Sequence, residues 1–260
     1  MGILLVDRAD GVVVLTLNRP ERRNGITVEL VEVFVAALQE IAATPADRVL
    51  VLTGAAGSFC SGMDLTERVT PDELTFMRRV GVLCRTLRDL PIPTLASVRG
   101  GAIGLGANLA LCADLVLAAQ DAVFGEVFAA RGIGLDGGGS WSLPHLLGPQ
   151  KAKEIAFFGQ SLTGRQAADL GMVNAAVPDA ELDALTADWA RRLAAGPRRA
   201  LSLMKAQINA AAQTSFAAAI EAESVAQAMC FKSPEAKEGI GAFLARRAPD
   251  FRKLDEAGGN

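Results

Sequence analysis

The stretch RGGAIGLGANLALCADL, residues 99–115, places four glycines directly before an apolar run with helical spacing. The β-rich run TLASVRG (94–100) leads into it, and the run LVLAA (115–119) follows it. Strands that alternate with helices in this way predict an α/β fold. The N–H groups around Leu105 would point out of the N-terminus of a helix that begins near Gly106, where they suit a negative charge or a polarised carbonyl oxygen. Close packing of the helix on a sheet explains the glycines equally well.

The same alternation extends toward the N-terminus and beyond the central stretch. The runs GVVVLTL (11–17) and RVLVLTG (48–54) read as strands, and the apolar positions of residues 26–42 follow helical spacing between them. Two capping boxes mark further helices. One is Thr70-Pro-Asp-Glu73, which opens a helix to about Leu90, and the other is Thr163-Gly-Arg-Gln166.

The C-terminal part of the chain loses the β signal and becomes rich in alanine. A Gly-Pro pair at 196–197 interrupts the helical pattern, Ser233-Pro234-Glu235 restarts it, and Ala248-Pro249 is expected to end that last helix. We therefore predict a core of residues 1–195 and a helical subdomain of residues 196–260.

Composition excludes several classes of function. The 260 residues carry a net charge of -3 with scattered Lys and Arg, so a nucleic-acid partner is not expected. The four cysteines form no C-x-x-C pair and there is one histidine, so we expect no disulfide framework and no metal site. The apolar uncharged run between Arg99 and Asp114 has 14 residues and is too short for a membrane span. No signal peptide is evident, and a cytoplasmic protein is expected.

Two further glycine-rich stretches hold candidate functional residues. In GSFCSGMDL (57–65) a glycine precedes Met63, which lets the backbone approach a ligand, although an ordinary strand-to-helix turn has the same pattern. In GIGLDGGGSWSLPHLLG (132–148) the carboxylate of Asp136 stands before three glycines, where a turn aspartate that caps its own backbone is the alternative. The glycine spacing of this stretch fits a dinucleotide fingerprint, but no β-run leads into it.

Six segments in order resemble the enoyl-CoA hydratase/isomerase family, also called the crotonase family. They are LTLNRPERRNGI, VLTGAAGSFCSGMDL, PTLASVRGGAIGLGANLALCADL, LPHLLG, LTGRQAADLGMVN and SPEAKEGIGAFLARR. The resemblance covers almost the whole chain. It implies an α/β, crotonase-like fold of repeated ββα units, with a helical C-terminal subdomain that builds homotrimers or hexamers.

The resemblance also implies a site for an acyl-CoA thioester, with coenzyme A as part of the substrate and no other cofactor. The backbone N–H groups of Met63 and Leu105 match the family's two donors to the thioester oxygen, which stabilise an enolate without reorganisation. The residues expected to bind substrate are Arg22, Arg23, Ser61, Asp64, Gly104, Phe128, Phe231 and Arg246. Phe231 and Arg246 match positions that reach the CoA site across a subunit boundary in some members.

The chain departs from the hydratase pattern at the two glutamates that add water. Asn108 and Phe128 occupy the matching positions, and neither acts as an acid or base at neutral pH. Glu126 is a rival for the second position. Some isomerase members place a single acid where Asp136 stands, so the leading hypothesis is a 3-enoyl to 2-enoyl-CoA isomerase with Asp136 as acid and base. The alternatives are a hydratase that uses Glu126 with Asp136, and an acyl-CoA-binding protein without catalysis.

Overall fold

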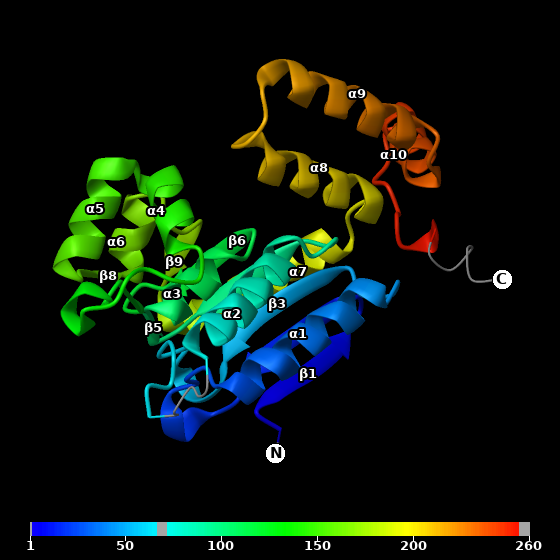
Figure 1. Cartoon of the computed structure of the whole chain (residues 1–260). Coiled ribbons are helices and arrows are strands. Elements are labelled where there is room, and N and C mark those ends of the chain that lie inside the picture. The colour runs from blue at the N-terminus through cyan, green and yellow to red at the C-terminus, as the bar shows by residue number, and fades with distance from the viewer. Residues whose placement is uncertain (1, 67–71, 255–260) are drawn as a thin grey trace.

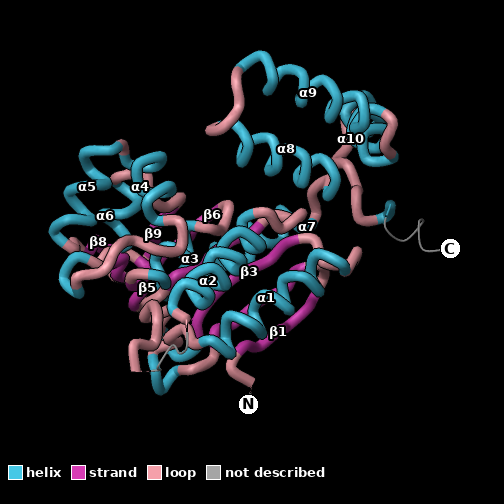
Figure 2. Tube along the Cα trace, in the orientation of Figure 1, coloured by secondary structure: helices cyan, strands magenta, loops and turns pink. Residues whose placement is uncertain are grey.

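Two β-sheets form the centre of the molecule (Figure 2), which a computed structural model describes over residues 2–66 and 72–254. The larger sheet has the spatial order β1 (Leu4–Ala9), β2 (Val12–Leu17), β3 (Val49–Gly54), β4 (Thr94–Val98), β6 (Leu115–Ala119) and β9 (Ala175–Val177). The smaller sheet has the order β5 (Gly101–Ile103), β7 (Val123–Gly125) and β8 (Ser161–Thr163). The β1–β2 and β7–β8 pairs are antiparallel, and the other pairs are parallel.

Helices connect and cover these strands (Figure 1). They are α1 (Val28–Ala43), α2 (Glu73–Arg88), α3 (Leu105–Leu111), α4 (Gly139–Leu147), α5 (Pro149–Phe158), α6 (Gly164–Asp169), α7 (Asp179–Ala194), α8 (Arg198–Ala211), α9 (Phe216–Phe231) and α10 (Pro234–Leu244), with short 3-10 turns at Pro20–Arg22, Ala55–Gly57 and Ala129–Arg131. Helices α1 and α2 pack side by side, and α7 packs on β2, β3, β4 and β6. Consecutive strands that belong to different sheets, followed by a helix, give the predicted α/β fold of ββα units.

Strand β2 shows why the larger sheet needs helices on both faces. Its residues alternate between partly and fully buried, with Val13, Leu15 and Leu17 completely buried. Val12 and Val14 point to the other face and line a cavity beside α7. In β3 the first four residues are all buried, as expected for a parallel strand covered on both sides.

The last three helices stand together as a group beside the α/β core in Figure 1. Helix α8 is anchored to the core by Lys205, whose Nζ lies 2.8 Å from Oδ2 of Asp114 and donates to O of Ile92 at 3.0 Å. Nδ2 of Asn209 donates to O of Arg88 at 3.1 Å. Within the described ranges, no helix has both the length and the apolar character that crossing a membrane requires.

The expected elements at 11–17, 48–54, 94–100 and 115–119 correspond to β2, β3, β4 and β6. The capping box at Thr163 is confirmed, because Gln166 N donates to Thr163 Oγ1 at 3.2 Å and Thr163 N donates to Gln166 Oε1 at 2.8 Å. Thr70 and Pro71 of the other box lie outside the described residues, and Asp72 caps α2 by accepting from Leu74 N.

Two expected helix ends were wrong. The first helix was expected from Ile26, but it begins at Val28 because Thr27 caps it and Ile26 pairs with Met63 in a β-bridge. The last helix was expected to continue to Ala248-Pro249, but α10 ends at Leu244, and Arg246 takes a φ of 53° that a right-handed helix does not allow.

Candidate active site

Two backbone N–H groups face one cavity from segments that are far apart in the sequence. Leu105 is the first residue of α3, so its N–H has no acceptor inside the helix. Met63 lies in a short parallel bridge with Ile26, in which the neighbouring groups make the bonds: Ile26 N donates to Gly62 O, and Asp64 N donates to Ile26 O. Within the described residues neither the Met63 nor the Leu105 N–H has a hydrogen-bond acceptor. Both therefore remain available to a ligand in a cavity of about 80 Å³.

Glycines bring these two N–H groups together. Gly62 has a φ of 86°, and a Cβ there would lie 2.5 Å from O of Ile103 and 3.5 Å from N of Leu105. A Cβ on Gly106 would lie 2.3 Å from O of Cys60. Contacts below 3 Å with backbone atoms cannot be relieved by a rotamer change, so the two segments approach this closely only with glycine at both positions.

The cavity between the two N–H groups is largely apolar. Leu65, Ile103, Val127, Phe128 and Ile133 contribute its apolar wall. Asp136 also lines it, and Asp136 is the only carboxyl group that does so in the described part of the chain. Burial raises the pKa of Asp136 to about 6, which is the range in which a carboxylate can both accept and return a proton near neutral pH.

The glycines that follow Asp136 let its loop lie directly on α3. Gly137 has a φ of 57°, and a Cβ there would lie 2.8 Å from Cδ1 of Leu105 and 2.9 Å from Cβ of Asn108. A Cβ on Gly139 would lie 2.5 Å from Nδ2 of Asn108. Nδ2 of Asn108 donates to the backbone O of Asp136 at 3.0 Å. Helix α3 thus begins with the free N–H of Leu105, and its Asn108, three residues later, holds the loop that carries Asp136.

The two positions that hold glutamates in the hydratase pattern have different surroundings. Phe128 packs its ring on Gly104, where a Cβ would lie 3.5 Å from the ring, and it closes one side of the cavity. Asn108 is completely buried against the Asp136 loop. Glu126 is 2% exposed and does not line the cavity, and its Oε2 lies 3.5 Å from Nδ2 of Asn108. Burial raises the pKa of Glu126 to about 7.

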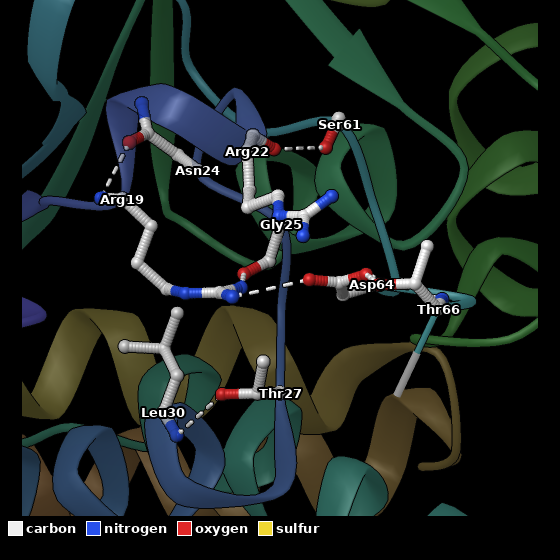
Figure 3. Close-up of polar contacts among 9 residues, drawn as sticks. All are labelled: Arg19, Arg22, Asn24, Gly25, Thr27, Leu30, Ser61, Asp64 and Thr66. Carbon is white, nitrogen blue, oxygen red and sulfur yellow. Dashed lines mark hydrogen bonds and ion pairs between the residues drawn. The ribbon is translucent and has the colours of Figure 1, made fainter. Parts of the chain in front are cut away.

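The carboxyl group of Asp64 is held by Arg19 and Thr66, as Figure 3 shows. Its Oδ2 forms an ion pair with Nη2 of Arg19 at 3.1 Å, and its Oδ1 accepts from N and Oγ1 of Thr66. The Thr66 bonds and the Arg19 guanidinium lower the pKa of Asp64. Asp64 stays ionised and holds the loop next to Met63. Sequence reasoning missed Arg19, whose Nη1 also donates to O of Gly25 at 2.6 Å.

The same segment contains the two arginines expected to meet the CoA phosphates. Ser61 contacts the backbone of both arginines. Its Oγ donates to O of Arg22 at 3.1 Å (Figure 3). Its N donates to O of Arg23 at 2.9 Å. The side chains of Arg22 and Arg23 are exposed beside the cavity loop. Phe231 and Arg246 lie in the helical group, Phe231 is 65% exposed, and neither lines the cavity.

Comparison with known proteins places this site in context. The family model described as enoyl-CoA hydratase/isomerase matches residues 7–254. The 1,2-epoxyphenylacetyl-CoA isomerase of Escherichia coli K12 is 36% identical, with 96% of this chain and 98% of that protein covered. A probable enoyl-CoA hydratase of Rhodobacter capsulatus is 35% identical, with 94% and 95% covered. A crystal structure of an enoyl-CoA hydratase from Polaromonas sp. JS666 superposes with a TM-score of 0.92 at 30% identity, over 96% of this chain and all of the other.

Proposed function

The chain belongs to the enoyl-CoA hydratase/isomerase family, and we propose that within this family it moves the double bond of an enoyl-CoA thioester from the 3- to the 2-position. The observation that carries this proposal is the pairing of two free backbone N–H groups with one carboxyl group in the same cavity. The two N–H groups would bind the thioester oxygen as it becomes negative, and the carboxyl group is the single group that could carry a proton.

The N–H groups of Met63 and Leu105 would bind the thioester oxygen. When Asp136 removes a proton from C2 of a 3-enoyl-CoA, the electron pair of the C–H bond is delocalised over C2, C4 and this oxygen. Two preorganised donors lower the energy of that dienolate, and each donor of this kind contributes on the order of 100-fold or more in rate. Asp136 then returns the proton to C4, and the double bond lies between C2 and C3.

The apolar part of the cavity wall favours an apolar acyl group, and burial raises the basicity of Asp136. Water addition in the family's hydratases needs two acids, whereas Asn108 and Phe128 stand at the matching positions. The name of the E. coli relative supports an isomerase, and that of the Rhodobacter relative supports a hydratase. The single carboxyl group in the cavity favours the isomerase.

The rest of the acyl-CoA would lie along the surface next to the cavity. The exposed side chains of Arg22 and Arg23 are placed to meet CoA phosphates, for which a guanidinium is well suited. Phe231 and Arg246 do not reach the cavity in their own chain. We propose that they contact the CoA of a neighbouring subunit in a homotrimer or hexamer.

The decisive experiment is a parallel assay of a 3-enoyl-CoA and a 2-enoyl-CoA. We expect isomerisation of the first, and a loss of about 10³-fold or more in kcat for Asp136→Asn, because the amide cannot accept the proton. Hydration of the 2-enoyl-CoA that survives Asp136→Asn would contradict the proposal. Binding of both thioesters with no turnover would identify a binding protein instead.

A further inference from the structure

Three residues from three segments lie together behind the cavity, and of the three only Asp136 lines it. Asn108 lies on α3, Glu126 directly follows β7, and Asp136 lies in the loop before α4. The Nδ2 group of Asn108 donates to O of Asp136 at 3.0 Å and contacts Oε2 of Glu126 at 3.5 Å. Asn108 is fully buried and Glu126 is 2% exposed.

This cluster has more hydrogen-bond acceptors than donors. Oδ1 of Asn108, Oε1 of Glu126 and Oδ1 of Asp136 are all buried and accept no bond from the described residues. The bond to the backbone of Asp136 fixes the orientation of the Asn108 amide, so its oxygen cannot be exchanged for a donor. A buried acceptor without a donor is costly, and a proton on one carboxyl group supplies a donor.

The position of the two carboxyl groups decides which one holds this proton. Burial raises the pKa of both, to about 6 for Asp136 and about 7 for Glu126, and the charge of Asp136 contributes to the higher value of Glu126. Asp136 therefore ionises first, and its negative charge then keeps the proton on Glu126. Two such groups titrate as a pair rather than independently.

The other titratable or charged side chains around this cluster do not replace that proton. They are Cys60 after β3, Cys84, Arg85 and Arg88 on α2, Cys112 after α3, and Arg131 at the cavity. Burial raises the pKa of Cys60 to about 12. The Cys112 thiol donates to O of Gly137 at 3.4 Å, and the interaction of the neighbouring Cys84 and Cys112 thiols raises the pKa of Cys84 and lowers that of Cys112. Burial raises the pKa of Glu126, the hydrogen bond from Asn108 lowers it, and the charge of Asp136 raises it.

We propose that Glu126 is a positioning residue that stays protonated while Asp136 works, so that the buried pair carries a single negative charge and Asn108 keeps the Asp136 loop against α3. This inference rests on the proposed role of Asp136. Glu126 does not touch the substrate, and its effect passes through the charge and placement of Asp136. Once Glu126 loses its proton, a second negative charge lies behind the acid, where it opposes formation of the dienolate.

The consequence is a bell-shaped dependence of kcat on pH. Activity rises as Asp136 becomes ionised near pH 6 and falls at higher pH as Glu126 becomes ionised. Glu126→Gln keeps an oxygen for Asn108 but has no proton to lose. We expect this variant to lose about threefold in kcat at pH 6.5 and to lack the alkaline decline, whereas the unmodified enzyme falls about tenfold or more below its maximum by pH 9.

The test is kcat for a 3-enoyl-CoA from pH 5 to 9.5 in the unmodified enzyme, Glu126→Gln and the matched control Glu181→Gln, whose side chain is exposed on α7. The control should keep the alkaline decline. An alkaline decline in Glu126→Gln with the same midpoint as in the unmodified enzyme would overturn the proposal. If Glu126→Gln does not fold, ¹³C-glutamate labelling of the unmodified enzyme gives the answer, since one glutamate carboxyl should still be protonated at pH 6, and ionisation of all of them by then would overturn it.

These outcomes separate this inference from the proposed function. Full activity of Asp136→Asn removes the role of Asp136 in catalysis. An inactive Asp136→Asn together with an unchanged alkaline decline in Glu126→Gln removes only the role of Glu126. The ¹³C titration of Glu126 needs no substrate and reports its protonation in either case.

Discussion

The side-chain amide of Asn108 donates to the backbone oxygen of Asp136 at 3.0 Å, so the helix that begins with Leu105, the proposed donor, also positions Asp136, the proposed acid. The donor and the acid are therefore fixed to one element of seven residues. Their separation depends on this bond, on the bond from Sγ of Cys112 to O of Gly137 at 3.4 Å, and on the close contact of Gly137 and Gly139 with Asn108. Each part of this arrangement can be disturbed separately.

Asn108→Ala tests the bond itself. The variant removes the side-chain bond that ties O of Asp136 to α3, leaves that oxygen with its local donor Gly139 N, and opens space beside Gly139, so we expect kcat to fall about 10- to 100-fold with little change in KM. Because O of Asp136 keeps its bond from Gly139 N, the lost bond should cost only about 1 kcal/mol in the free energy of unfolding. Asn174→Ala is the control, because it removes a comparable bond to the backbone N of Val116 away from the site. Unchanged kcat in Asn108→Ala would show that Asp136 needs no such support.

Gly62→Ala tests the approach of the two N–H donors. The added methyl would lie 2.5 Å from O of Ile103, so the Met63 segment must move away from Leu105, and we expect a loss of about 100-fold or more in kcat. Gly57→Ala is a matched control, since Gly57 also has a positive φ, of 73°, but has open space around its Cβ position. Both variants carry backbone strain, and only Gly62→Ala should lose activity.

Asp136→Asn tests how much the buried, ionised carboxyl group of Asp136 lowers the free energy of unfolding. Its pKa is raised from 3.8 to about 6, so the folded state binds the proton more tightly than the unfolded state does. The resulting stabilisation is complete below pH 3.8 and is lost as the pH rises through 6, a change of about 3 kcal/mol. We therefore expect Asp136→Asn to be more stable than the unmodified chain at pH 8 and nearly equal to it at pH 3.5. Denaturant unfolding at the two pH values measures this, and a variant less stable at pH 8 would contradict the burial of an ionised Asp136.

Arg19→Gln tests the ion pair that supports the Met63 loop. The pair is mostly buried, and its loss leaves Asp64 with the Thr66 bonds alone, so we expect the loop to loosen and kcat/KM to fall about tenfold. Arg8→Gln removes the ion pairs of Arg8 with Asp47 and Glu40, whose residues do not line the cavity, and should leave kcat/KM unchanged. Equal kinetics in the two variants would show that the Arg19 pair has no effect on the site.

The sequence pointed to Met63 and Leu105 because the close approach of their segments depends on glycines, and their role as donors stays a prediction. Gly62 and Gly106 stand where any side chain would collide with backbone, and a requirement of that kind is visible as a residue type. Asp136 was visible for a related reason, as the carboxylate in front of glycines that pack on α3. The resemblance to a known family then gave these positions their expected chemistry.

Contacts between distant side chains could not be read in this way. Arg19 and Asp64 are 45 positions apart, and nothing in either segment distinguishes their pair from surface charges. Glu126 was named as an alternative to Phe128 only because the two are close in the sequence. Its burial next to Asn108 depends on the smaller sheet, because Glu126 directly follows β7. That sheet has strands of three residues, which are too short to show a period. Strand β1 was missed because most of its residues are exposed.

The two donors belong to the main chain, so the identities of Met63 and Leu105 carry almost no chemical information. Gly62 and Gly106 set the approach of these two N–H groups, while the side chain of Leu105 is constrained for another reason, its burial in the core. A distant relative with the same chemistry would thus be recognised by glycines at the positions of Gly62 and Gly106. The apolar wall formed by Leu65, Val127 and Ile133 is then free to diverge, and a change in acyl preference can evolve there without disturbing the reaction centre.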